Sequence, residues 1–131
     1  MASIFSKIAR GEIPSYKIAE NEKFYAFLDI NPLTSGHTLV IPKEETDYLF
    51  DISDVELCDF MIFAKKIATA IKKAVPCRRV GLAVIGFDVP HAHIHLIPMN
   101  GMQDIDFNRD RVKLTSEEFQ AVANSIAKYM D

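Results

Sequence analysis

The chain has 131 residues, of which 49% are hydrophobic and 25% are charged, and its formal net charge is −3. These values are ordinary for a globular protein, and we expect a single domain over residues 1–131. The charge provides no basic field to attract nucleic acid, and two cysteines are too few for a disulfide scaffold. Since the chain also shows no signal peptide and no apolar run of roughly 18 residues, we expect a cytoplasmic protein without a membrane or nucleic-acid partner.

The first part of the chain predicts a short helix followed by a strand hairpin. Ser3 can cap the helix, which would run to about Ala9. Residues 23–30 and 36–42 are rich in aromatic and β-branched residues, and they flank the turn-forming sequence NPLTS. These two segments therefore predict a pair of antiparallel strands.

One long helix is expected next, from Ser53 to about Val75. Ser53 forms a capping box with Glu56, and Pro76 ends the helix. The apolar residues between these ends recur at steps of three and four, so the helix has one face that can lie on a sheet.

Residues 80–85 and 91–98 predict a second hairpin, around the turn GFDVP, and a last helix is expected to begin at Thr115, capped with Glu118. Hairpins around one long helix indicate an α+β domain with a mostly antiparallel sheet covered on one face. The polar connection 99–113, which contains Arg109 and Arg111, could close over a ligand, cross to a second subunit or be a solvated loop.

Three of the four histidines occupy alternate positions in HAHIHLIP. On a strand, alternate side chains share one face, so His91, His93 and His95 are expected on the open face of the sheet. The fourth, His37, opens a neighbouring strand segment and could join them. The row by itself allows a zinc site or catalysis by imidazole, and Gly86 in the preceding turn allows either close backbone approach to phosphate or an ordinary hairpin.

The sequence from His91 to Ile97 matches the His-φ-His-φ-His-φ-φ signature, with φ apolar, of the histidine triad family of nucleotide hydrolases and transferases. Residues 4–44, which include DINPLTSGHTLVIPK, resemble the N-terminal half of the Hint branch and its bacterial relatives, and the similarity covers about residues 3–98. The resemblance implies a mostly antiparallel five-stranded sheet with one long helix and short terminal helices. It also implies a homodimer joined through the long helix and the strand that follows it.

The activity implied by the resemblance is cleavage at the α-phosphate of a purine nucleoside phosphoramidate or dinucleoside polyphosphate, without a cofactor. His93 would be the nucleophile and would form a covalent nucleotidyl-histidine that water resolves, which suits imidazole because it is unprotonated near neutral pH. His95 would contact the phosphate and share its charge, while His91 and His37 would orient the site and assist proton transfer.

The nucleotide-binding residues implied by the resemblance fall into three groups. The first group would surround the base: Ile4, Phe5, Ile8, Phe27 and Leu28. The second is Asp29, which would accept hydrogen bonds from the ribose hydroxyls. The third would contact the phosphate: Gly86, Phe87 and Asp88. For one or two of the apolar five, ordinary core packing is the expected alternative.

Two departures from the family pattern affect these expectations. Many bacterial relatives hold structural zinc with Cys-x-x-Cys and a later histidine, whereas this chain has Ser3, Ser6 and Glu45 there, so no bound metal is expected. The usual Gly-Gln-Ser/Thr-Val is replaced by a sequence containing Asp88, which would repel a phosphate by roughly 1 to 4 kcal/mol unless turned away, paired with an arginine or charging a histidine.

The exchange at Asp88 could favour a cationic amine leaving group, as in a nucleoside phosphoramidate. Two other functions stay open: a nucleotide-binding interaction module with little turnover, and a hydrolase that binds metal directly through the histidine row.

Overall fold

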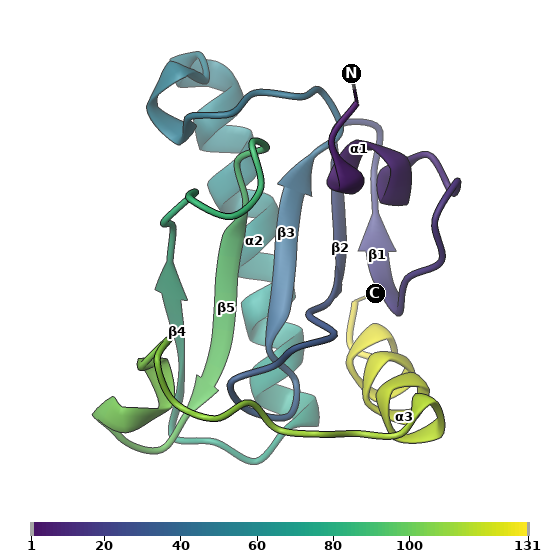
Figure 1. The fold of residues 1–131 in the computed structure, drawn as a ribbon, viewed down its shortest axis with the longest axis vertical. Coiled ribbons are helices and arrows are strands. Elements are labelled where there is room, and N and C mark those ends of the chain that lie inside the picture. Colours follow the sequence, from purple (N-terminus) through teal and green to yellow (C-terminus); the bar gives the residue numbers. More distant parts are fainter. Residues whose placement is uncertain (1, 131) are drawn as a thin grey trace.

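The structure is a computed structural model that describes residues 2–130. Five strands form one antiparallel sheet in the order β1-β2-β3-β5-β4 (Figure 1). The strands are β1 (Lys17–Glu20), β2 (Phe24–Leu28), β3 (Thr38–Pro42), β4 (Arg79–Ala83) and β5 (Ile94–Met99). The helices are α1 (Ile4–Ala9), α2 (Asp54–Ala74) and α3 (Ser116–Ala127), with short 3-10 turns at Leu49–Asp51 and Met102–Ile105.

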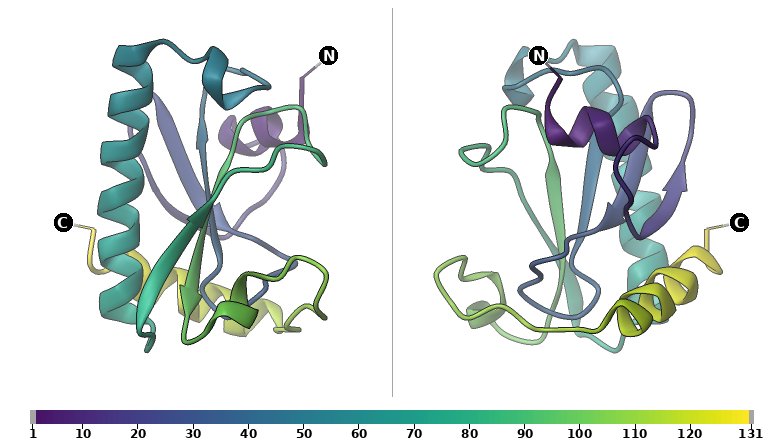
Figure 2. Two further views of the ribbon diagram at one scale, coloured as in Figure 1. Left: turned by 90° about the vertical axis from the view of Figure 1, so that its left-hand side faces the viewer. Right: turned by 45° about the vertical axis from the view of Figure 1, so that its right-hand side comes forward.

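The helices lie on both faces of the sheet, but unequally. The long α2 crosses one face, with α3 packed beside it against β1, while the short α1 lies on the other face (Figure 2). The main core lies under α2 and includes Phe24, Phe60 and Ile94, none more than 2% exposed. The α+β fold and the antiparallel five-stranded sheet are therefore confirmed, and none of the helices within residues 2–130 is long and apolar enough to cross a bilayer.

The expected helix caps are present in the structure. The Ser3 hydroxyl accepts a hydrogen bond from the Ser6 N–H at 3.0 Å, and Thr115 and Glu118 make a complete capping box. At α2 only half of the predicted box forms: Ser53 accepts from the Glu56 N–H, but the Glu56 carboxylate makes an ion pair of 2.9 Å with Lys23 instead. A long-range ion pair has replaced a local hydrogen bond there.

The strands differ from the sequence prediction in two places. The residue pattern predicted four strands and missed β1, because the four residues of β1 are too few to show the alternating hydrophobic period of a strand. The last strand begins at Ile94 rather than at His91, since the Ala92 N–H donates to the Thr46 carbonyl and not to the neighbouring strand β3. His91 and His93 therefore precede β5, on the side of the sheet that carries α1.

Candidate active site

A cavity of about 500 Å³ opens on the face of the sheet that carries α1. Its wall combines α1, the end of β2, the turn before β5 and part of the connection to α3. Every residue predicted to bind nucleotide lines it, together with two of the four predicted catalytic residues: Ile4, Phe5, Ile8, Phe27, Leu28, Asp29, Gly86, Phe87, Asp88, His93 and His95. The other two, His37 and His91, lie behind this wall and are 0% exposed.

The apolar end of the cavity is built by α1 and the neighbouring strands. Phe5, Ile8 and Phe27 belong to a small second core under α1, and they present a rigid apolar surface to the cavity. Ile4 stands at the rim and is 50% exposed. Leu28 packs in the main core under α2, because side chains alternate along β2 and Phe27 takes the cavity face. The expected alternative of core packing therefore applies most clearly to Leu28.

His93 has the hydrogen-bond pattern of a nucleophile. Its Nδ1–H donates to the carbonyl oxygen of His91 at 2.8 Å, and a carbonyl can only accept. This bond fixes the tautomer, so that Nε2 carries a lone pair in a side chain that lines the cavity. The Phe5 ring packs edge-on against the imidazole, with 5.0 Å between ring centroids, and holds it in place.

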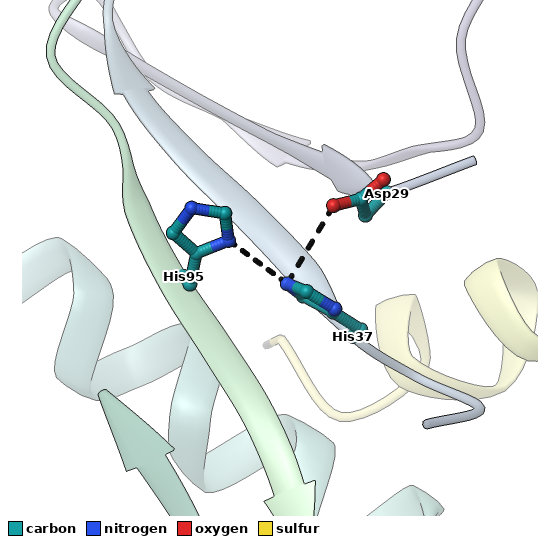
Figure 3. Close-up of side chains that lie close together, drawn as sticks. All are labelled: Asp29, His37 and His95. Carbon is teal, nitrogen blue, oxygen red and sulfur yellow. Dashed lines mark hydrogen bonds and ion pairs between the residues drawn. The ribbon is translucent and has the colours of Figure 1, made fainter. Parts of the chain in front are cut away.

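His95 and His37 form a relay of hydrogen bonds with a defined direction. The Leu33 N–H donates to His37 Nδ1 at 3.0 Å, so the proton of His37 is on Nε2. His37 Nε2–H then donates to His95 Nδ1 at 2.9 Å, which leaves the proton of His95 on Nε2 (Figure 3). His95 therefore presents an N–H donor to the cavity, beside the lone pair of His93.

The relay is kept uncharged by burial. Burial lowers the pKa of His37 to about 3, and the nearby Arg111 charge acts in the same direction. Burial, together with the neighbouring histidines His37 and His93, lowers the pKa of His95 to about 3. Both imidazoles are neutral near pH 7, so His95 offers a hydrogen bond and holds no acidic proton to transfer.

Asp29 stands at the end of the relay, at the mouth of the cavity. Its Oδ2 lies 3.6 Å from His37 Nε2, and its Oδ1 accepts a hydrogen bond from the Asn31 N–H at 2.8 Å (Figure 3). Asp29 lines the cavity and its side chain is 16% exposed, so the carboxylate is partly accessible there.

Asp29, His37 and His95 also bring three possible metal-ligand atoms within 4.8 Å of one another, the one such group within residues 2–130. The hydrogen-bond pattern opposes metal binding there. His37 accepts a backbone N–H at Nδ1, so its Nε2 carries a proton and has no lone pair for a cation. The geometry fits a hydrogen-bond relay better than a metal site.

His91 serves the scaffold rather than the cavity. Its Nε2–H donates to the Pro42 carbonyl at 2.7 Å, and its Nδ1 lies 2.7 Å from the Ser3 hydroxyl. The Glu45 carboxylate accepts from the Ser3 N–H and the Ser6 hydroxyl, both at 2.7 Å. The residues that replace the zinc ligands of bacterial relatives are thus joined by hydrogen bonds that tie α1 to the sheet.

The turn before β5 forms the exposed wall of the cavity. Gly86 has a φ of 82°, a left-handed conformation that favours glycine. Phe87 is 91% exposed, and Asp88 is also exposed and makes no ion pair with any residue between 2 and 130. Asp88 could reduce its repulsion of a phosphate by turning away, by pairing with an arginine or by charging a histidine. Among the residues that the structure describes, pairing with an arginine is not seen.

The connection between β5 and α3 adds two residues to the cavity, of which the sequence prediction named Arg111 and missed Phe107. Phe107 packs edge-on against His95, with 4.9 Å between ring centroids, and Arg111 lies beside Phe107. Of the three roles considered for segment 99–113, closing over the cavity is the one these contacts support. No local motif marks the two residues, because their position depends on how the chain returns across the sheet.

Comparison with known proteins agrees with this geometry. The family model described as "HIT domain" matches residues 10–102. Adenosine 5'-monophosphoramidase HNT1 of Saccharomyces cerevisiae is 44% identical over 98 residues, 74% of this chain and 62% of the yeast protein. Adenosine 5'-monophosphoramidase hnt1 of Schizosaccharomyces pombe is 35% identical over 130 residues, 97% of each chain.

Among solved structures, a HIT-like protein from Bartonella henselae, described as involved in cell-cycle regulation, superimposes with a TM-score of 0.82 at 31% identity. The superposition covers 97% of this chain and 95% of the other. Sequence and structure therefore agree with the resemblance seen in the histidine row: the chain belongs to the HIT family.

Proposed function

We propose that this chain is a nucleotide hydrolase or transferase that acts at the α-phosphate of a purine nucleoside phosphoramidate or dinucleoside polyphosphate. One observation carries the proposal: the 2.8 Å hydrogen bond from His93 Nδ1–H to the His91 carbonyl, which leaves a lone pair on Nε2 inside a cavity of nucleotide size. The names of the two yeast relatives support the same class of substrate.

In the proposed first step, the lone pair of His93 Nε2 attacks the α-phosphorus and forms a P–N bond. The bond from phosphorus to the leaving group breaks, and the leaving group departs with the electron pair and takes a proton from solvent. In the second step, water attacks the same phosphorus and loses a proton to solvent. The P–N bond breaks, its electron pair returns to His93 Nε2, and a nucleoside monophosphate is released. Phosphorylated imidazole is a good leaving group, so both steps are accessible near neutral pH.

His95 would stabilise the charge that develops on the phosphoryl oxygens, because its Nε2–H is aimed at the cavity before the substrate arrives. His37 would act through His95, holding its tautomer through the 2.9 Å bond. The low pKa of His37 supports this orienting role and argues against a stored proton for transfer.

The base and ribose would occupy the end of the cavity near α1. Phe5, Ile8 and Phe27 supply apolar surface for a purine, and the carboxylate of Asp29 accepts hydrogen bonds from ribose hydroxyls. Gly86 and its neighbours would supply backbone amides near the phosphate, where the φ of Gly86 turns the chain sharply.

The decisive experiment is turnover of adenosine 5'-phosphoramidate by the wild type and by His93→Ala. We expect the variant to lose about 10⁴-fold or more in kcat, because it lacks the Nε2 lone pair to which the proposal assigns the attack. Intact-mass measurement during turnover should show a nucleotidyl adduct on the wild type and none on the variant. Absence of adduct and turnover across a panel of nucleotides would leave a binding module with little turnover as the better interpretation.

The position of Asp88 bears on which leaving group the site prefers. An exposed, unpaired carboxylate at the cavity wall supports a preference for an amine leaving group over a polyphosphate. Strong preference for diadenosine tetraphosphate over adenosine 5'-phosphoramidate in the same panel would contradict it.

The homodimer stays a prediction. Strand β4 is the last in the sheet order, and exposed apolar side chains gather on it and on α2, at Leu82, Met61 and Ile62. An apolar helix face beside an unpaired strand edge is suited to pairing with a second copy of the chain.

A further inference from the structure

One charged side chain of the cavity wall has no part in the proposed reaction. Arg111 lies in the connection to α3, and its segment is held against the residues after β2 by a 2.9 Å bond from the Val112 N–H to the Pro32 carbonyl. The guanidinium donates from Nη1 to the Asn31 carbonyl at 2.7 Å and from Nη2 to the Phe107 carbonyl at 3.3 Å. The cation is therefore built into the wall.

Phe107 brings this cation close to the catalytic imidazoles. The guanidinium lies 5.7 Å from the centroid of the Phe107 ring, whose edge-on contact with His95 was described above. The charge of Arg111 also contributes to the lowered pKa of His37 and of His95. The positive charge of Arg111 therefore influences the imidazoles at the cavity and behind its wall.

The charge of Arg111 is not neutralised by any carboxylate within residues 2–130. Both of its hydrogen-bond acceptors are neutral carbonyls, and its remaining N–H groups have no acceptor in that part of the chain. Arg109, two residues earlier, is different: its Nη1 lies 2.9 Å from the carboxylate of Asp104, and it does not line the cavity. A fixed guanidinium with free N–H groups in a cavity is suited to bidentate binding of an oxyanion.

We propose that Arg111 forms a second anion subsite, which takes an oxyanion of the nucleotide other than the α-phosphate. This inference rests on the proposed function, which places the α-phosphate at His93 and the ribose at Asp29. Arg111 is anchored on Asn31, two residues after Asp29, at the ribose end of the catalytic relay. The oxyanion is therefore a phosphate, carried either on the ribose or next to the α-phosphate.

Calorimetric binding of three nucleotides tests the subsite without requiring turnover. AMP carries the α-phosphate alone, adenosine 3',5'-bisphosphate adds a phosphate on the ribose, and ADP adds one beyond the α-phosphate. We expect the wild type to bind one of the doubly phosphorylated nucleotides about tenfold more tightly than AMP, the size of a charge-assisted hydrogen bond. Which nucleotide gains affinity identifies the source of the phosphate.

Variants assign the gain to one side chain. Arg111→Gln should remove the tenfold preference and weaken AMP binding much less than it weakens the doubly phosphorylated nucleotide, Arg111→Lys should keep part of the preference, and Arg109→Gln, the matched control on the same segment, should keep all of it. Equal affinity of the wild type for all three nucleotides would overturn the subsite, whether or not the variants fold. An equal loss for AMP in Arg111→Gln would also overturn it, since Arg111 would then serve the α-phosphate. Failure of AMP itself to bind the wild type would overturn the proposed function as well.

Discussion

The two ends of the histidine row act differently, although they share one residue type and one motif. His93 and His95 line the cavity, and each keeps one ring nitrogen free to face it. His91 is 0% exposed, and both of its ring nitrogens are occupied by protein groups, the Pro42 carbonyl and the Ser3 hydroxyl. A histidine whose two nitrogens are satisfied inside the protein ties elements together, whereas one with a free nitrogen in a cavity is available for chemistry.

The comparison also shows how the chain holds α1 in place. Glu45, Ser3, Ser6 and His91 form a continuous set of hydrogen bonds between α1 and the sheet. Because Phe5 packs on both His91 and His93, the position of α1 affects His93, the proposed nucleophile. His91, the buried end of the row, thus helps to hold His93 in place through the packing of Phe5.

The largest expected effect on kcat in this comparison comes from substituting His95, which lines the cavity. His95→Ala removes an N–H donor of the cavity that we propose binds the phosphate, and we expect kcat to fall by about 10²- to 10³-fold, as for other preorganised donors. The free energy of unfolding should fall by only about 1 kcal/mol, for the lost bond to His37. Steady-state kinetics measure kcat, and urea unfolding measures the free energy of unfolding. A kcat within tenfold of the wild type would contradict the difference in role between His95 and His91.

The opposite balance is expected for His91→Ala. Truncation leaves the Pro42 carbonyl and the Ser3 hydroxyl without their partner in a buried site, and we expect a loss of about 2 to 4 kcal/mol in the free energy of unfolding. At a temperature where the variant is folded, kcat should stay within about tenfold of the wild type, because His91 does not face the cavity. A large loss of kcat at unchanged stability would place His91 in the chemistry.

The third expected effect is a dependence of stability on pH. Folding lowers the pKa of His37 and His95 from about 6.5 to about 3, so between these values the unfolded chain binds more protons than the folded one. Stability should therefore be unaffected by these groups above pH of about 6.5 and should decrease as the pH falls toward 3. Urea unfolding at several pH values should show this slope, and His37→Gln should reduce it; an identical slope in the variant would exclude His37 as a source.

Much of the fold was predictable because its signals are local. The caps at Ser3 and Thr115, the hairpins and the long α2 each depend on residues close together in the sequence. The strand β1 pairs with its neighbour in the sequence, β2, but its four residues are too few to show a strand period. The exchange of Glu56 from its cap to Lys23 depends on a partner far along the chain, so no local pattern could identify it.

The sequence by itself determined the α+β class, which follows from local hydrophobic periods and turn residues, and the family, which follows from a specific motif. The resemblance that the motif carries, rather than any periodicity, indicated most of the side chains that line the cavity. Only the tertiary structure decided what each histidine does. The three imidazoles of HAHIHLIP are equivalent in sequence, and their roles diverge through the Ser3 hydroxyl on α1, the backbone oxygens of Pro42 and His91, and the relay through His37. The sequence named Arg111 only as part of a connection that could close over a ligand, and its place in the cavity depends on how the chain folds back beside Asn31.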